Sequence, residues 1–209
     1  MPVNLVTVTN VPRDTQTNPN AQFLNGSGKA AGNWFGTPAG SLAISNINRF
    51  ARFVFDTTTE NLNNASTGVR RFYHLYGQYA FLNGTHQIHK GVDLRSLRSN
   101  ARVLSAHQGF IARRTDLGAV IIRNTDANVS HVYAHMSNLT ANNSVGLFTV
   151  LGNQSNVGLG QNGVAHLHYE VRSGTSTTDL GSPLNHNFTG NVNPYAHMVR
   201  VIGHIGFSI

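Results

Sequence analysis

Two histidines separated by a single residue, His166 and His168, carry the strongest chemical signal in this 209-residue chain. Side chains repeat with period two along a β-strand, so both imidazoles would leave the same face of a sheet. Upstream, His89 and Asp93 offer an imidazole and a carboxylate four residues apart. Imidazole and carboxylate are zinc ligands, and imidazole also moves protons near neutral pH. Together the two segments could supply His, Asp and His to one metal and leave one histidine for proton transfer.

The amino-acid composition narrows this chemistry. The chain has no cysteine, which excludes disulfides, thiolate zinc sites and cysteine nucleophiles. Any metal must therefore be held by His, Asp, Glu or water. Histidines number 11 against 8 acidic residues, and only Glu60 and Glu170 are glutamates. A glutamate general base is thinly provided, and the chain has no His-Glu-x-x-His segment.

The formal net charge of +7 favours an anionic partner through electrostatic steering. Most of the basic residues are arginine, which binds phosphate and carboxylate groups in bidentate fashion. Charge alone leaves nucleic acid, anionic cell-wall polymers and acidic membranes eligible as partners. A specific nucleic-acid binder is the weaker interpretation, because the chain has no recognised reading motif and no aromatic stacking signature.

The elements that must position these residues read as short strands broken by turns. Strand-like runs lie at residues 102–106, 110–113, 119–123, 129–135 and 147–151 and around the two histidines 166 and 168. Gly109 and Gly118 separate the first three runs, and a glycine- and asparagine-rich loop at residues 152–163 precedes the last. This spacing predicts an antiparallel sheet or sandwich with few short helices. Residues 41–56 mix the helical and strand periods and are ambiguous.

Three motifs, taken in order, resemble those of the zinc-dependent cell-wall endopeptidases of the lysostaphin and LytM type, the M23 peptidases. They are His-x-Gly-x-Asp at residues 89–93, Tyr-Ala-His-x-Ser at residues 133–137 and His-Leu-His-Tyr-Glu-Val at residues 166–171. The Ala-x-x-Gly segment at residues 106–109 and Asn-Pro-Tyr at residues 193–195 also match the family pattern. The resemblance covers roughly residues 72–198 and implies a lysostaphin-type β core with a groove over the sheet.

The resemblance also implies roles for five side chains. His89, Asp93 and His168 would bind one zinc ion per chain, with a water completing the tetrahedron. This agrees with the three protein ligands and one open position of catalytic zinc. By the same carry-over His135 and His166 are catalytic residues, and either of them could be the general base.

We therefore expect a zinc-dependent endopeptidase that hydrolyses peptide bonds in the stems or cross-bridges of bacterial peptidoglycan. The alternative is a non-catalytic cell-wall-binding or hydrolase-activating protein on the same scaffold, although such relatives usually lack ligands that are all retained here. The expected partners are peptidoglycan and anionic cell-wall polymers, and we expect a monomer. No run approaches the roughly 20 apolar residues of a membrane-spanning helix. We expect a secreted or cell-envelope protein, with no signal peptide visible in this numbering.

The polar stretch at residues 61–68 is the candidate domain boundary. It divides an N-terminal extension, residues 1–68, from an M23-like catalytic domain, residues 69–209. The extension could pack on the sheet, target the wall or cover the groove as a pro-segment.

Several other residues receive structural interpretations. His86 could compete as a ligand, but the motif spacing favours His89. His107 and His131 are expected at the surface or satisfied in the core. Glu170 is expected to pair with an arginine and so orient its strand. A polymer-binding face could be formed by Arg70, Arg71, Arg95, Arg98, Arg102, Arg113 and Arg114.

Overall fold

The computed structural model describes residues 49–55, 69–70, 79–82, 85–96, 98, 100–124, 128–160, 163–174, 191–192, 194 and 198. The expectations for residues 1–48, for the polar boundary at residues 61–68 and for the side chains of Arg70, Arg71 and His86 lie outside this description. Among the described residues, no helix has the length and apolar character needed to span a membrane.

The described elements are mostly strands. A helical segment at residues 49–54 precedes them. The strands are β1 (Val69–Arg70), β2 (Tyr79–Leu82), β3 (Thr85–Ile88), β4 (Val92–Ser96), β5 (Arg102–Leu104), β6 (Gly109–Arg114), β7 (Ala119–Asn124), β8 (Val129–Ala134), β9 (Met136–Ser137), β10 (Ser144–Val145), β11 (Val150–Gln154), β12 (Leu167–Ser173) and β13 (Asn191–Val192). A short 3₁₀ helix, η3 (Thr115–Leu117), connects β6 to β7.

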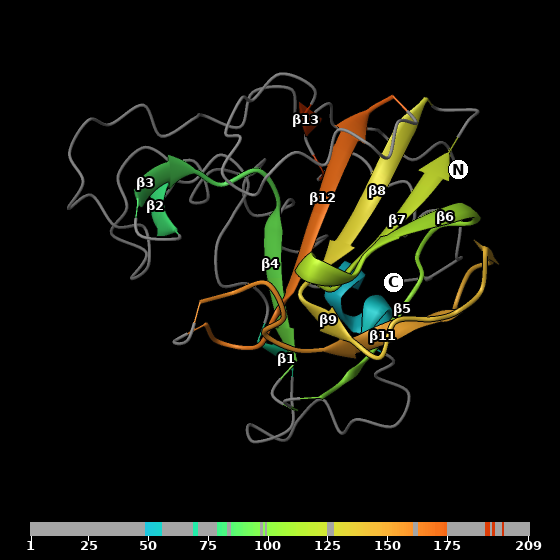
Figure 1. Cartoon of the computed structure of the whole chain (residues 1–209), viewed down its shortest axis with the longest axis horizontal. Coiled ribbons are helices and arrows are strands. Elements are labelled where there is room, and N and C mark those ends of the chain that lie inside the picture. Colours follow the sequence, from blue (N-terminus) through green and yellow to red (C-terminus); the bar gives the residue numbers. More distant parts are fainter. Residues whose placement is uncertain are drawn as a thin grey trace.

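The large sheet has the strand order β1-β4-β12-β8-β7-β6-β10, and β13 also pairs with β12. All of these pairings are antiparallel. A smaller sheet has the order β5-β11-β9, and β2 and β3 form a hairpin. Figure 1 shows β12, β8 and β7 side by side, with β9 and β11 at one end of them. The mainly antiparallel β class predicted from the sequence is confirmed.

Strand β12 shows why this sequence makes a sheet with two different faces. Its residues Leu167, Tyr169 and Val171 are fully buried in the main core, as the period of two requires. The intervening residues His168 and Glu170 therefore point to the opposite face. One strand thus supplies both the core and the polar face that carries the predicted chemistry.

The helical segment at residues 49–54 resolves the ambiguity noted in the sequence. Phe50 and Val54 are fully buried, and Phe53 is nearly so. The ring of Phe50 lies 4.7 Å from that of Tyr169, centroid to centroid, on the core side of β12. This helix shares one hydrophobic core with both sheets. The boundary between residues 68 and 69 stays a prediction, but residues 50–55 pack in the same core as the strands that follow.

Candidate metal centre

The pairing of β4 with β12 places two polar side chains opposite each other. Asp93 on β4 is the register partner of His168 on β12, so both side chains lie on the same face. His89 precedes β4 and approaches the same point, with Gly91 between it and Asp93. A Cβ atom at position 91 would lie 2.4 Å from the backbone oxygen of Tyr169 and 2.7 Å from Nε2 of His168. Only glycine therefore allows this close approach.

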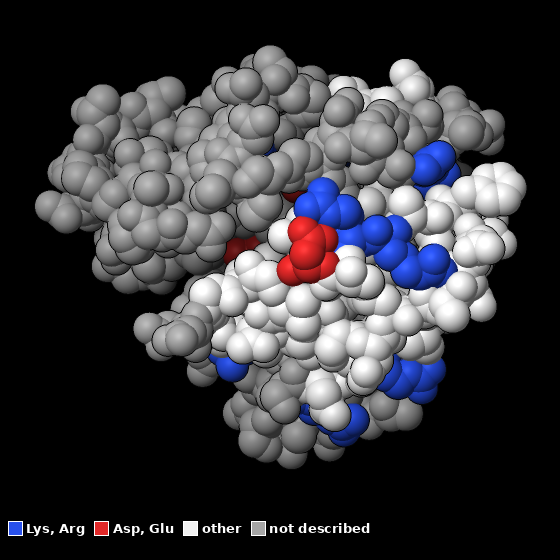
Figure 2. Space-filling view, in the orientation of Figure 1, with Lys and Arg blue, Asp and Glu red and all other residues white. Residues whose placement is uncertain are grey.

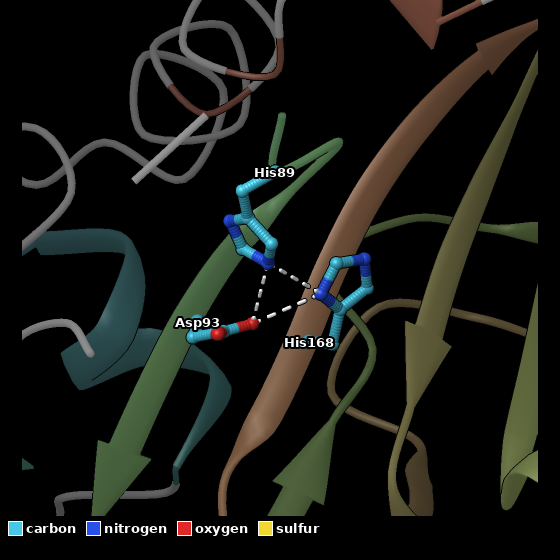
Figure 3. A group of neighbouring side chains, drawn as sticks. All are labelled: His89, Asp93 and His168. Carbon is cyan, nitrogen blue, oxygen red and sulfur yellow. Dashed lines mark hydrogen bonds and ion pairs between the residues drawn. The ribbon is translucent and has the colours of Figure 1, made fainter. Parts of the chain in front are cut away.

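Three donor atoms converge at this point, and we call them the donor triangle: His89 Nε2, Asp93 Oδ1 and His168 Nδ1. The two nitrogens are 3.1 Å apart, and the carboxylate oxygen is 3.1 Å from His89 Nε2 and 2.9 Å from His168 Nδ1. Figure 3 shows the three side chains pointing toward one another from β4, the segment before it and β12. The structure thus brings together the three side chains that the sequence grouped, while their role as ligands stays a prediction.

The donor triangle fits a zinc ion. A tetrahedral site with metal–ligand distances of about 2.0 Å places neighbouring ligand atoms about 3.3 Å apart, close to the separations here. His89 Nε2 and His168 Nδ1 face each other, so at most one hydrogen can lie between them and at least one nitrogen presents a lone pair. Two imidazole nitrogens and one carboxylate oxygen are a donor set that zinc accepts.

A carboxylate and an arginine support His168 from its other side. Glu170 Oε2 lies 3.3 Å from His168 Nε2, and Arg172 donates a 2.6 Å hydrogen bond from Nε to Glu170 Oε1. Burial alone would raise the pKa of Glu170, but the His168 hydrogen bond and the Arg172 charge lower it to about 2. Glu170 is therefore an acceptor for Nε2–H, which leaves Nδ1 as the His168 atom of the donor triangle. The arginine partner expected for Glu170 is Arg172.

The electrostatics of the site favour a positive charge at His168. Burial lowers the pKa of His168, yet hydrogen bonds and the charges of Asp93 and Glu170 outweigh burial and raise it to about 9. The pKa of Asp93 lies well below its ordinary value, because the neighbouring histidines outweigh its burial. Two buried carboxylates thus stabilise either a proton or a metal cation at this position.

The two histidines predicted to be catalytic lie beside the donor triangle. The ring of His166 lies 4.9 Å from that of His135, and the ring of His135 lies 5.8 Å from that of His168. Nε2 of His166 is 3.4 Å from Asp93 Oδ1. Burial, together with the nearby His168 and His166, lowers the pKa of His135 to about 3, so its ring is neutral near neutral pH. Their catalytic roles stay predictions.

Both rings are oriented by backbone carbonyl groups. Nδ1 of His135 lies 2.9 Å from the oxygen of Val157, and Nδ1 of His166 lies 2.7 Å from the oxygen of Val164. A carbonyl can only accept, so Nδ1 carries the hydrogen and Nε2 of each neutral ring carries the lone pair. The roles of Val157 and Val164 could not be predicted from the sequence, because every residue has a carbonyl group and residue type does not mark this role.

His107 and His131 lie in the core, on the opposite side of the sheet from the donor triangle. Their rings stack with centroids 3.4 Å apart. Nδ1 of His107 is 2.7 Å from the hydroxyl of Tyr133, and Nδ1 of His131 is 3.0 Å from that of Tyr169. Both are buried and hydrogen-bonded, in line with the core interpretation from the sequence.

Two arginines of the predicted polymer-binding face have structural partners. Arg113 donates to the backbone oxygens of Thr140 and Asn142, and Arg114 forms a 2.6 Å ion pair with Asp116. Figure 2 shows Lys and Arg side chains spread over the side of the molecule that is seen in Figure 1, with fewer Asp and Glu side chains among the described residues. The polymer-binding role of the face stays a prediction.

Residues 87–180 match the model of peptidase family M23. A mutant catalytic domain of the prophage-encoded M23 protein EnpA from Enterococcus faecalis is 24% identical over 58% of this chain and 85% of that chain, with a TM-score of 0.42. The catalytic domain of lysostaphin from Staphylococcus simulans is 16% identical over 64% and 92%, with a TM-score of 0.44. A chain of the SpoIIQ–SpoIIIAH pore-forming complex is 19% identical over 61% of this chain and 76% of that chain, also with a TM-score of 0.44.

A search of curated proteins gives no match to the chain. The family match includes all of the donor triangle and both neighbouring histidines, since positions 89, 93, 135, 166 and 168 fall inside it. The resemblance predicted from the sequence is therefore confirmed over residues 87–180, which are similar to peptidase family M23.

Proposed function

We propose that this protein is a zinc-dependent endopeptidase that hydrolyses peptide bonds in the stems or cross-bridges of bacterial peptidoglycan. The observation that carries the proposal is the donor triangle, with its 2.9–3.1 Å separations, beside two further histidines in an M23 domain. Three protein donors leave one tetrahedral position for water or substrate, as in catalytic rather than structural zinc sites.

Each side chain has a defined task in this proposal. His89, Asp93 and His168 would hold the ion through the atoms of the donor triangle. When bound, zinc polarises a carbonyl group and lowers the pKa of water. His135 and His166 keep Nδ1 on a backbone carbonyl, so Nε2 is the atom that exchanges protons. Because these rings are neighbours, either can accept the proton of the attacking water and deliver it to the leaving amine.

The substrate class rests on charge as well as on the family. Bacterial envelopes are rich in phosphate and carboxylate, and a formal net charge of +7 favours adsorption to them. Peptidoglycan and anionic wall polymers are the proposed partners of a monomeric enzyme that acts in the cell envelope or outside the cell.

The test uses the full chain and defined peptidoglycan fragments. Zinc content is measured by elemental analysis, and the products are weighed by mass spectrometry with and without a chelator. We expect one zinc per chain, and cleavage that is lost with the chelator and restored by zinc. Full activity in metal-free protein would contradict the proposal. Zinc binding and adsorption to peptidoglycan without cleavage would instead favour the non-catalytic alternative on the same scaffold.

A further inference from the structure

A serine directly after β11 lies between the two histidines that the proposed mechanism uses for proton transfer. Ser155 is half-buried and forms an isolated antiparallel bridge with His166. Its backbone oxygen accepts the backbone N–H of His166 at 3.1 Å. Its own backbone N–H donates to the backbone oxygen of His135 at 2.9 Å. Ser155 therefore joins the backbones of both histidines.

The hydroxyl group of Ser155 adds a second connection to His135. It donates to the backbone oxygen of His135 at 3.0 Å and accepts the backbone N–H of Val157 at 3.2 Å. The oxygen of Val157 in turn accepts Nδ1–H of His135 at 2.9 Å. These contacts form a closed circuit that runs from the backbone of His135 through Ser155 and Val157 to the ring of His135.

The backbone of His135 requires such support. Its φ of 65° lies in the left-handed region, which residues other than glycine rarely adopt. A residue keeps this conformation where its surroundings hold it, and such positions cluster at functional sites. On the other side, the N–H of His135 donates to the oxygen of Leu117 at 3.1 Å. Ser155 provides the opposing contacts on the carbonyl group.

We propose that Ser155 is a positioning residue whose hydroxyl group holds Val157 against His135 and thereby sets the orientation and tautomer of the His135 ring. This inference rests on the proposed function for its kinetic consequence only. The contacts predict that the hydroxyl keeps the hydrogen of His135 on Nδ1 and the lone pair on Nε2, where a proton acceptor is needed. The donor triangle receives no contact from this hydroxyl among the described residues, so zinc binding does not depend on it.

The experiment compares Ser155→Ala with Ser155→Thr, which restores a hydroxyl group. Thr149→Val is the matched control, because Thr149 Oγ1 also accepts a backbone N–H at 3.2 Å, from Gly146 in a turn before β11. In Ser155→Ala we expect kcat to fall about 10-fold, as for other groups that orient a functional histidine. KM and zinc content should be unchanged, Ser155→Thr should recover most of the rate, and Thr149→Val should match the wild type.

Nitrogen-15 NMR of the imidazoles separates positioning from general stability. In the wild type we expect His135 as the Nδ1–H tautomer, and in Ser155→Ala a mixture with the Nε2–H tautomer. An unchanged His135 signal with wild-type kcat in Ser155→Ala would overturn the proposal, as would a loss that Ser155→Thr fails to recover. If the wild type cleaves no peptidoglycan, the proposed function fails, and the NMR comparison still decides whether Ser155 positions His135.

Discussion

The two ring nitrogens of His168 have different partners, and this difference determines what the residue can bind. Nδ1 belongs to the donor triangle and lies next to Asp93, whereas Nε2 faces Glu170. Arg172 in turn donates a hydrogen bond to Glu170. A metal-binding histidine is typically oriented in this way by a carboxylate on its second nitrogen. In the proposed metal site, Glu170 would therefore orient His168 without contributing an atom to the donor triangle.

Replacing Glu170 by glutamine tests this support. The amide keeps a similar shape but loses the charge that strengthens the hydrogen bond from Nε2–H. We expect zinc affinity to fall about 10-fold or more, measured by competition with a chromophoric chelator. The control is Asp116→Asn, which removes an exposed carboxylate from the Arg114 ion pair. Equal affinities for both variants and the wild type would show that Glu170 has no such role.

A ligand and a proton-transfer residue should give different losses. His89→Ala removes one corner of the donor triangle, so both zinc and turnover should disappear. His166→Ala leaves the donor triangle intact and should keep stoichiometric zinc while kcat falls about 100-fold or more. Elemental analysis and fragment digestion of the same samples provide the comparison. Retention of zinc in His89→Ala would contradict the role of His89 as a ligand. Loss of zinc in His166→Ala would contradict a role of His166 in proton transfer alone.

At the scale of elements, the site depends on how closely β4 approaches β12. The space at Gly91 is bounded by the backbone oxygen of Tyr169, which cannot move without displacing the strand. The glycine is therefore required by the contact between two strands and by the position of His168. The sequence motif contains this glycine, and the structure supplies the physical reason for it.

Gly91→Ala should separate the strands and disturb the donor triangle. We expect a loss of about 1–3 kcal/mol in the free energy of unfolding, as for other substitutions that overfill a packed site. Zinc affinity should fall as well. Gly146→Ala is the control, because a Cβ atom at position 146 meets no heavy atom within 4 Å. Both variants are compared by denaturant unfolding and by zinc titration. Equal stability and equal zinc affinity of the two variants would show that the close approach of β4 to β12 does not require glycine at position 91.

Some of this architecture could be predicted from the sequence and some could not. The alternation of apolar and polar residues in β12 predicted a strand with His166 and His168 on one face, because period two is a local property. The helix at residues 49–54 escaped prediction because six residues are too few for its apolar residues to show a clear helical period. Strand register and the contact between His135 and the carbonyl group of Val157 are set by long-range packing, which residue types do not record.

At the scale of the whole molecule, the polar face of β12 depends on a core that is completed by a segment from far upstream. Phe50 contacts Tyr169 on the core side of β12, and both side chains are fully buried. The same strand holds His168 on its other face. The packing of the upstream helix and the position of the donor triangle are therefore linked through one strand.

Phe50→Ala should destabilise the protein by about 3 kcal/mol or more, because it leaves a cavity behind β12. Phe110→Ala is the matched control, since Phe110 is 71% exposed and surface substitutions usually change stability by only about 0.5 kcal/mol. Thermal or denaturant unfolding measures both. If the two variants were equally stable, the upstream helix would not contribute to this core in solution.

The pairing of Asp93 with His168 also has a consequence for how the chain reaches its native state. A slip of β4 by one residue would turn every side chain of that strand over. The aspartate would then enter the aromatic interior, and Leu94 would occupy the position meant for a metal donor. Misaligned chains would lose apolar burial and metal affinity in a single step, so dissolved zinc should draw the folding population toward the correct alignment.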